Sequence, residues 1–252
     1  MSNLPPGVTK AAATGFDKLL SVQRPVVLAH LRSIRRRNPH ASPDQVIRIL
    51  ERRYLAAVTA GGAAVGASAA LPIVGVGASV ALSAAETGGF LEASALFAQS
   101  ITELHGIAID DPDRARTLVM TLILGSAGST LVKQFAGEVT GTAPARTAFW
   151  GELVTKSLPK AAVGKVADQL KKSFIRKFGV SQGASIIGRA IPFGIGAVIG
   201  GTGNHILGRQ IVRGSREAFG AASPIFGANL DFVPTLSRAD RKALKQLERL
   251  EQ

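Results

Sequence analysis

Residues 54–85, YLAAVTAGGAAVGASAALPIVGVGASVALSAA, form a stretch of 32 residues without a charged side chain. Alanine and glycine predominate in this stretch, and Pro72 divides it just after Leu71. A transmembrane helix needs about 20 continuous and mostly large apolar residues, whereas small residues spaced like Gly62 and Gly66 let two helix backbones approach closely. We therefore predict a packed helical hairpin that breaks at Leu71–Pro72. A membrane-inserting hairpin is the alternative hypothesis.

Helix signals flank this stretch on both sides. Ser42 and Pro43 are residue types favoured at the N-cap and the first position of a helix, so we expect a helix to begin there and to continue into the glycine-rich stretch. The second arm of the hairpin is expected from Val74 to His105, and Asp111 with Pro112 indicates the start of a further helix. Alternation typical of strands is lacking. The sequence thus predicts an all-α helical bundle.

A second glycine-rich stretch, residues 190–208, is free of charge over 19 residues. We expect it to form a second hairpin that packs beside the first in the centre of the bundle. The glycines expected at these contacts are Gly61, Gly62, Gly66, Gly194, Gly196 and Gly200. Glu86, Asn204 and His205 are expected as polar groups inside this apolar centre. Buried polar groups either form hydrogen bonds between helices or mark a ligand site, and the sequence leaves both readings open.

The chain is strongly basic although it is also apolar. It has 30 Lys+Arg against 17 Asp+Glu, a net charge of +13, and 46% apolar residues. Positive charge is concentrated in residues 1–53 and 156–216, and residues 149–178 combine it with a helical apolar stripe. This pattern predicts basic amphipathic helices outside the glycine-rich centre.

Basic amphipathic helices are suited to anionic membrane surfaces. The residues expected to bind such a surface are Arg35, Arg36, Arg37, Lys171, Lys172, Arg176 and Lys177. A solvated helix face and nucleic-acid binding are the alternatives. Because the chain has one Trp, one Tyr and no recognisable DNA- or RNA-binding motif, nucleic acid is the less favoured partner.

Motifs for catalysis are lacking. The chain has no cysteine, which excludes thiol catalysis and Cys-ligated zinc. None of its four histidines has the spacing of a metal site, and no GxSxG nucleophile motif occurs. The glycines of residues 194–200 are one residue out of register with a dinucleotide-binding fingerprint and follow no strand pattern. We therefore expect no catalytic residues, no cofactor and no metal.

The order of these features resembles the EcsC family of bacterial proteins, over roughly Ser42 to Gly220. The residues that carry the resemblance are GGAAVG at 61–66, Leu71–Pro72, His105–Gly106, Asp110–Asp111–Pro112, IPFGIGAVIG at 191–200, Asn204 and Ala218–Phe219. Where the family often has an aspartate after the first hairpin and a Tyr-Gly pair, this chain has Glu86 and His105–Gly106. The resemblance implies a helical, membrane-associated bacterial protein without a well-defined biochemical activity.

Three segments follow from these patterns: a basic N-terminal helical segment (1–41), an EcsC-like helical domain (42–220), and a loop with a charged C-terminal helix (221–252). The N-terminus lacks the features of a signal peptide. We expect a non-enzymatic protein that binds lipid or acyl chains at an anionic membrane surface, cytoplasmic and peripheral to the inner face of the cell membrane. The alternatives are a membrane-inserting protein, pore-forming or transporter-associated, and an oligomeric structural or cargo-like adaptor with itself or another protein as partner.

Overall fold

The computed structural model describes residues 22–68, 76–140, 149–184 and 195–230. For residues 68, 76–81, 83–84, 139–140, 174–184, 195–199 and 228 it describes the course of the backbone alone. All regular elements in these ranges are helical, which confirms the predicted all-α fold. The bends of the two predicted glycine-rich hairpins fall on residues 69–75 and 185–194, outside the described residues.

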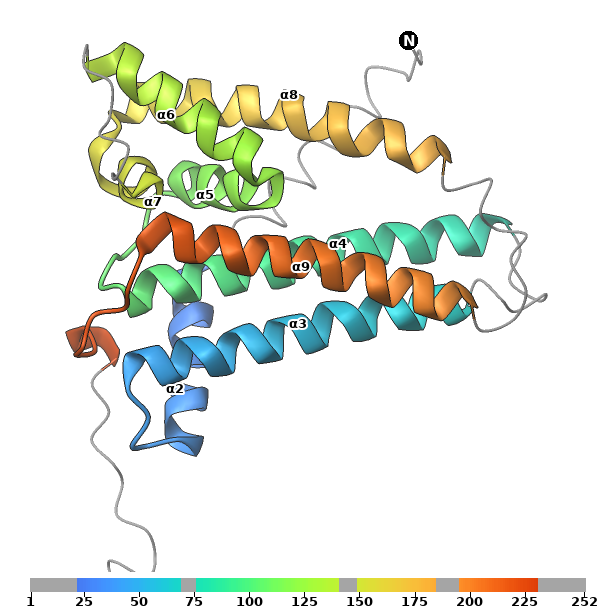
Figure 1. The fold of residues 1–252 in the computed structure, drawn as a ribbon, viewed down its shortest axis with the longest axis horizontal. Helices are drawn as coiled ribbons and strands as arrows, with labels where there is room; N and C mark the ends of the chain where they lie inside the picture. The colour runs from blue at the N-terminus through green and yellow to red at the C-terminus, as the bar shows by residue number, and fades with distance from the viewer. Residues whose placement is uncertain (1–21, 69–75, 141–148, 185–194, 231–252) are drawn as a thin grey trace, which may run out of the picture.

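Three long helices form the centre of the molecule: α3 (Pro43–Ser68), α4 (Val76–Leu104) and α9 (Ile195–Phe219). They run side by side, and α9 is antiparallel to α3 (Figure 1). Between α3 and α4, the ring of Tyr54 stacks on that of Phe97 at 4.6 Å between centroids. The buried hydroxyl of Tyr54 forms a 2.8 Å hydrogen bond with Ser94 Oγ. Apolar packing and paired polar groups therefore hold α3 against α4.

Four further helices and a π-helix form a second layer on one side of this centre (Figure 1). They are α5 (Pro112–Leu124), α6 (Ser126–Thr140), the short α7 (Trp150–Glu152), a π-helix η1 (Leu153–Ser157) and α8 (Lys160–Ala184). Helix α8 packs on α5 and α6 through the buried Val163, Val166 and Leu170, while its lysines 160, 165 and 172 are exposed. It is thus an outer, basic amphipathic helix.

Local capping explains where two of the helices begin. At the start of α3, Gln45 N donates to Ser42 Oγ (3.3 Å) and Ser42 N donates to Gln45 Oε1 (2.8 Å), so the two residues form a reciprocal capping box. At the start of α5, Asp113 N donates to Asp111 Oδ1 at 2.9 Å. Both helix starts predicted from the sequence are confirmed.

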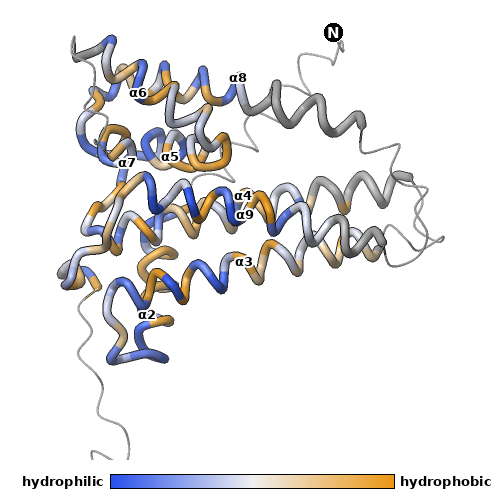
Figure 2. The backbone as a smooth tube through the Cα atoms, viewed as in Figure 1, coloured by the Kyte–Doolittle hydropathy of each residue, from blue (hydrophilic) through white to orange (hydrophobic). Residues whose placement is uncertain are grey.

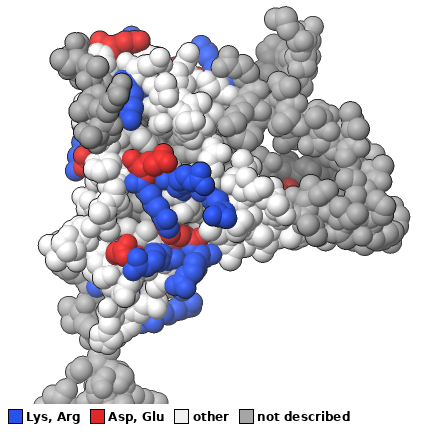
Figure 3. All heavy atoms as spheres, in the orientation of Figure 1, with Lys and Arg blue, Asp and Glu red and all other residues white. Residues whose placement is uncertain are grey.

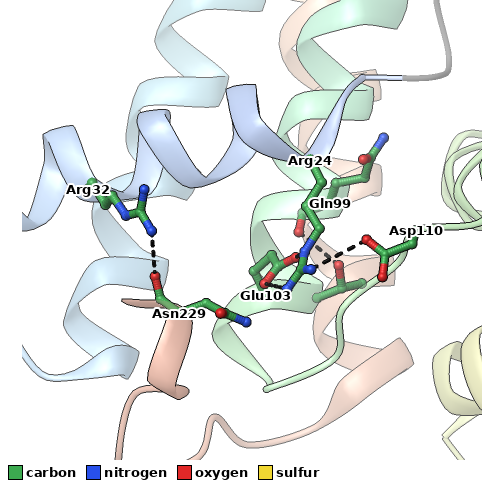
Figure 4. Close-up of polar contacts among 7 residues, drawn as sticks. Arg24, Arg32, Gln99, Glu103, Asp110 and Asn229 are labelled. Atoms are coloured by element: carbon green, nitrogen blue, oxygen red, sulfur yellow. Dashed lines mark hydrogen bonds and ion pairs between the residues drawn. The ribbon is translucent and has the colours of Figure 1, made fainter. Parts of the chain in front are cut away.

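The described residues on either side of 42–220, which are 22–41 and 221–230, contribute to the same core. Helix α2 (Arg24–Arg37) buries its apolar face, and Leu230 in the 3₁₀ turn η3 (Ala228–Leu230) is also buried. Arg24 Nε donates to Glu103 Oε1 at 2.5 Å, and Arg24 Nη1 to Asp110 Oδ1 at 3.3 Å, while Arg32 Nη2 donates to the carbonyl oxygen of Asn229 at 3.2 Å (Figure 4). These bonds hold α2 between α4 and the C-terminal turn.

Within the described ranges, none of the helices combines the length and the hydropathy needed to cross a membrane.

Candidate functional site

Two of the predicted packing glycines lie where α3 crosses α9. A Cβ atom added at Gly62 would come within 2.5 Å of the carbonyl oxygen of Gly200, and one added at Gly200 would come within 2.4 Å of the carbonyl oxygen of Gly62. The Cα of Gly66 would lie 3.6 Å from the Cβ atom added at Gly200. Backbone atoms therefore fill this crossing and leave no room there for an acyl chain.

The other predicted glycines are placed differently. Gly61 is exposed, and a Cβ atom added to it would meet nothing within 4 Å. Gly194 lies outside the described residues, and the contacts of Gly196 are not among those described. Of the six glycines, Gly62, Gly66 and Gly200 thus make up the described contact between the two helices.

The side-chain amide of Asn204 links all three central helices. From α9, Asn204 Nδ2 donates to the carbonyl oxygen of Val58 on α3 (3.1 Å) and to Glu86 Oε1 on α4 (3.0 Å). A primary amide carries two N–H protons, so both bonds can form together. Beside it, His205 Nδ1 and Thr59 Oγ1 lie 3.0 Å apart, a second bond from α9 to α3. We call Thr59, Glu86, Asn204 and His205 the Asn204 cluster.

Glu86 in this cluster is half-buried and its pKa is raised. The chief cause is burial, which disfavours the charged carboxylate, and the hydrogen bond from Asn204 opposes it in part. No ion pair compensates the charge of Glu86 within the described part of the chain. The three polar groups predicted inside the apolar centre therefore meet partners on neighbouring helices, and one of them holds a proton more tightly than an ordinary glutamate does.

The basic residues expected to bind an anionic surface do not share one surface. Arg35 is only 8% exposed, because it lies one turn after Leu31 on the buried side of α2, and its guanidinium stacks 3.8 Å from the centre of the Phe226 ring. The prediction of a surface role for Arg35 is therefore wrong. Arg36 and Arg37 are exposed at the end of α2.

The lysines of α8 lie elsewhere. Lys172 is exposed and Lys171 is half-buried, while the side chains of Arg176 and Lys177 are outside the described set. Helices α2 and α8 lie on opposite sides of the three central helices (Figure 1). The predicted cationic residues thus form two separate groups.

A basic surface that the sequence analysis missed lies over α3 and α9. Its side chains gather on one face of the molecule in Figure 3, and we call this surface the arginine face. Its exposed members are Arg48, Arg52, Arg209, Arg213 and Arg216. Spacings of four residues, as between Arg209 and Arg213, put each group on one side of its helix. The antiparallel pairing of α3 with α9 then joins the two groups. The glycines indicate that the two helices pack together, but the direction and register of that pairing have no local signal in the sequence.

Only part of this charge is neutralised. Arg48 is paired with Asp44, and Arg216 donates two hydrogen bonds to Glu51, at 2.7 and 2.6 Å. These four residues border a cleft of about 370 Å³. Two of them are acidic and two are basic, so their charges cancel at this cleft. Arg52, Arg209 and Arg213 form no ion pair with any described residue. They supply the uncompensated positive charge of the arginine face.

The described residues contain no group of three His, Asp or Glu side chains placed to hold a metal ion. No protein family, no curated protein and no solved structure matches the chain.

Proposed function

We propose that this chain is a non-enzymatic, membrane-associated helical protein that binds anionic lipid at a membrane surface. The observation that carries the proposal is a set of three exposed arginines on two antiparallel helices, Arg52, Arg209 and Arg213, which have no carboxylate partner among the described residues. Each Lys or Arg held near an anionic bilayer contributes about 1 kcal/mol. Three of them contribute about 3 kcal/mol together, and the exposed Arg36 and Arg37 on α2 can add to this attraction.

An anionic bilayer suits this surface better than a nucleic acid does. Binding of single strands relies on exposed aromatic rings on which bases stack. Trp150 and Tyr54 are both buried, at 4% and 5% exposure, and Phe149, which is 44% exposed, belongs to neither of the two helices that carry the arginine face. Readout of a duplex requires a helix that enters a groove. Here the arginines lie across two helices packed side by side, and such a surface matches a broad anionic plane.

The contact at Gly62 and Gly200 bears on where lipid binds. Since the backbones of α3 and α9 touch there, we place the lipid on the outer face of these helices and not between them. The likeness of Ser42–Gly220 to the EcsC family is part of the same proposal, because it implies membrane association. In that proposal the protein is peripheral to the inner face of the bacterial cell membrane.

Vesicle flotation tests this function. The full chain is mixed with vesicles of phosphatidylcholine alone, or of phosphatidylcholine with phosphatidylglycerol, at low and at high salt. We expect flotation with phosphatidylglycerol at low salt and release at high salt, because salt screens exposed charges. Equal recovery in the soluble fraction under all four conditions would refute the proposal.

A further inference from the structure

A groove of about 470 Å³ lies at the turn between α2 and α3, where the arginine face reaches its edge. It is formed by this turn and by the first turns of α3 (Figure 1), and all of its lining residues belong to the described part of the chain. Pockets for small ligands have volumes of roughly 300–1,000 Å³. The turn is mostly hydrophilic (Figure 2), so the groove suits a polar ligand and not an acyl chain. Its polar side chains are Asn38, His40, Gln45, Arg48 and Arg52.

The groove has positive charge and no carboxylate among its lining residues. Arg48 borders both this groove and the cleft of about 370 Å³ in which two acidic and two basic side chains cancel. Arg48 pairs with Asp44 through one guanidinium nitrogen, and an exposed pair of this kind is weak, so its other N–H groups remain available. Arg52 forms no ion pair with any described residue. An anion is therefore expected in the groove and not in the cleft.

Two side-chain amides and a histidine add hydrogen-bond donors to the two arginines. Gln45 Oε1 accepts from Ser42 N at 2.8 Å, which leaves the amide NH₂ group of Gln45 as a donor. Asn38 Nδ2 donates to the carbonyl oxygen of Ile34 at 2.9 Å and has a second proton to donate. His40 is exposed, and an imidazole ring has an N–H donor in either charge state. The groove thus offers donors from five side chains.

The turn that forms the groove is held by its own hydrogen bonds. Ala41 N donates to the carbonyl oxygen of Asn38 at 3.2 Å, and the capping box of Ser42 and Gln45 fixes the start of α3. Pro39 restricts the backbone further, because its ring fixes φ. A site that is ordered before binding loses little conformational entropy when a ligand enters it.

We propose that this groove binds a phosphomonoester, the group that phosphatidic acid presents at a membrane surface. A phosphomonoester has three acceptor oxygens and a charge of about −1.5 to −2 at neutral pH, whereas the phosphodiester of phosphatidylglycerol has one terminal oxygen fewer and a single charge. Two guanidinium groups beside a histidine and two amides match the acceptor with more oxygens. The proposal rests on the membrane binding proposed above and names the headgroup that is recognised.

Vesicles of equal zeta potential test this selectivity, because delocalised charge alone predicts equal affinity for them. The full chain is titrated with phosphatidylcholine vesicles that contain either phosphatidic acid or phosphatidylglycerol. Arg52→Ala and His40→Ala change the groove. Arg213→Ala is the matched control, because it removes one exposed arginine from the same face outside the groove.

A second arm tests a soluble source of the same group. Glycerol 3-phosphate is added to the isotope-labelled chain without vesicles, and glycerol is the control. Backbone NMR shifts over residues 38–52 report binding in the groove. A circular dichroism melt of each variant shows whether its fold is retained.

We expect the unaltered chain to bind phosphatidic acid vesicles roughly fivefold to tenfold more tightly than phosphatidylglycerol vesicles, through the added charge-assisted hydrogen bonds. This preference should be lost in Arg52→Ala and His40→Ala and kept in Arg213→Ala, although both arginine variants bind phosphatidylglycerol more weakly than the unaltered chain. Shifts over residues 38–52 with glycerol 3-phosphate, without a preference between the lipids, would support the groove as a site for a soluble phosphomonoester.

Two results would overturn the groove proposal and leave the arginine face in place. One is equal binding of both kinds of vesicle without shifts from glycerol 3-phosphate, and the other is a lipid preference that persists in both groove variants. If neither kind of vesicle is bound, the proposed membrane function fails. The shifts with glycerol 3-phosphate then decide for or against the groove on their own.

Discussion

Gly62 on α3 and Gly200 on α9 lie face to face, so close that a Cβ atom on Gly200 would stand 2.4 Å from the carbonyl oxygen of Gly62. Heavy atoms do not approach each other to this distance without displacement, so the crossing of the two helices depends on glycine at both positions. The same crossing positions Asn204 against α3 and α4, because a Cβ atom on Gly62 would also meet Asn204 Nδ2 at 2.7 Å. Helix packing and the Asn204 cluster are therefore coupled.

The first prediction concerns this crossing. Gly62→Ala should lower the free energy of unfolding by about 1–3 kcal/mol, because the added methyl group forces the backbones apart. Gly61→Ala is the matched control, since its methyl group would meet nothing within 4 Å. It should raise the free energy of unfolding by up to about 1 kcal/mol through helix propensity. Denaturant unfolding of both variants measures the difference, and the same effect in both would contradict the described packing.

The second prediction concerns the proton on Glu86. Burial raises the pKa of Glu86 in the folded protein, so the folded state binds the proton more tightly than the unfolded chain does. Stability should therefore fall as pH rises from the ordinary pKa of a glutamate through the raised value. Glu86→Gln stays neutral and retains an oxygen that accepts from Asn204.

The Glu86→Gln variant should be as stable as the wild type in acid and more stable than the wild type at neutral pH. Thermal unfolding across the pH range gives the comparison, and a wild-type stability that rises over that window relative to Glu86→Gln would contradict the prediction. Asn204→Ala provides a second check. Its loss of the opposing hydrogen bond should raise the pKa of Glu86 further, as followed by NMR titration of the carboxyl group.

The third prediction concerns the attachment of α2. The Glu103 side chain is only 6% exposed and bonds to Arg24, which is 25% exposed. Arg24→Met should cost about 2 kcal/mol of stability, because it leaves this carboxylate without its charged hydrogen bonds. Adding Glu103→Gln should recover part of the loss. Arg48→Met is the control: both members of its pair with Asp44 are 57% exposed, so the cost should stay below about 0.5 kcal/mol. Equal losses of stability at the two sites would contradict the role of Arg24 as the partner of the buried Glu103 carboxylate.

Helix starts could be predicted from the sequence because their determinants are local. Ser42 and Gln45 cap each other across three residues, and Asp111 caps the helix that Pro112 begins. The burial of Arg35 can also be predicted from the sequence, because Leu31 and Ile34 place it on the apolar side of α2. The helical period thus separates the buried Arg35 from the exposed Arg36 and Arg37, although the three are adjacent in the sequence.

The partners within the site could not be predicted. Glu86 and Asn204 are 118 residues apart in the chain, and Glu51 and Arg216 are 165 apart. Both contacts depend on how α9 lies against α3 and α4, which is a property of the whole fold. The sequence predicted which groups would be polar within an apolar centre, whereas the fold determines that they meet and that α3 and α9 present one arginine face.

The central claim is that the arginine face binds an anionic bilayer, and its most direct test is a vesicle titration of two triple variants. One replaces Arg52, Arg209 and Arg213 with alanine, and the matched control replaces three exposed lysines of α8, Lys160, Lys165 and Lys172. At about 1 kcal/mol per arginine, we predict roughly 100-fold weaker binding to phosphatidylglycerol-containing vesicles for the first variant and a much smaller loss for the second. Equal losses in the two variants, or unchanged binding of the arginine variant, would contradict the claim.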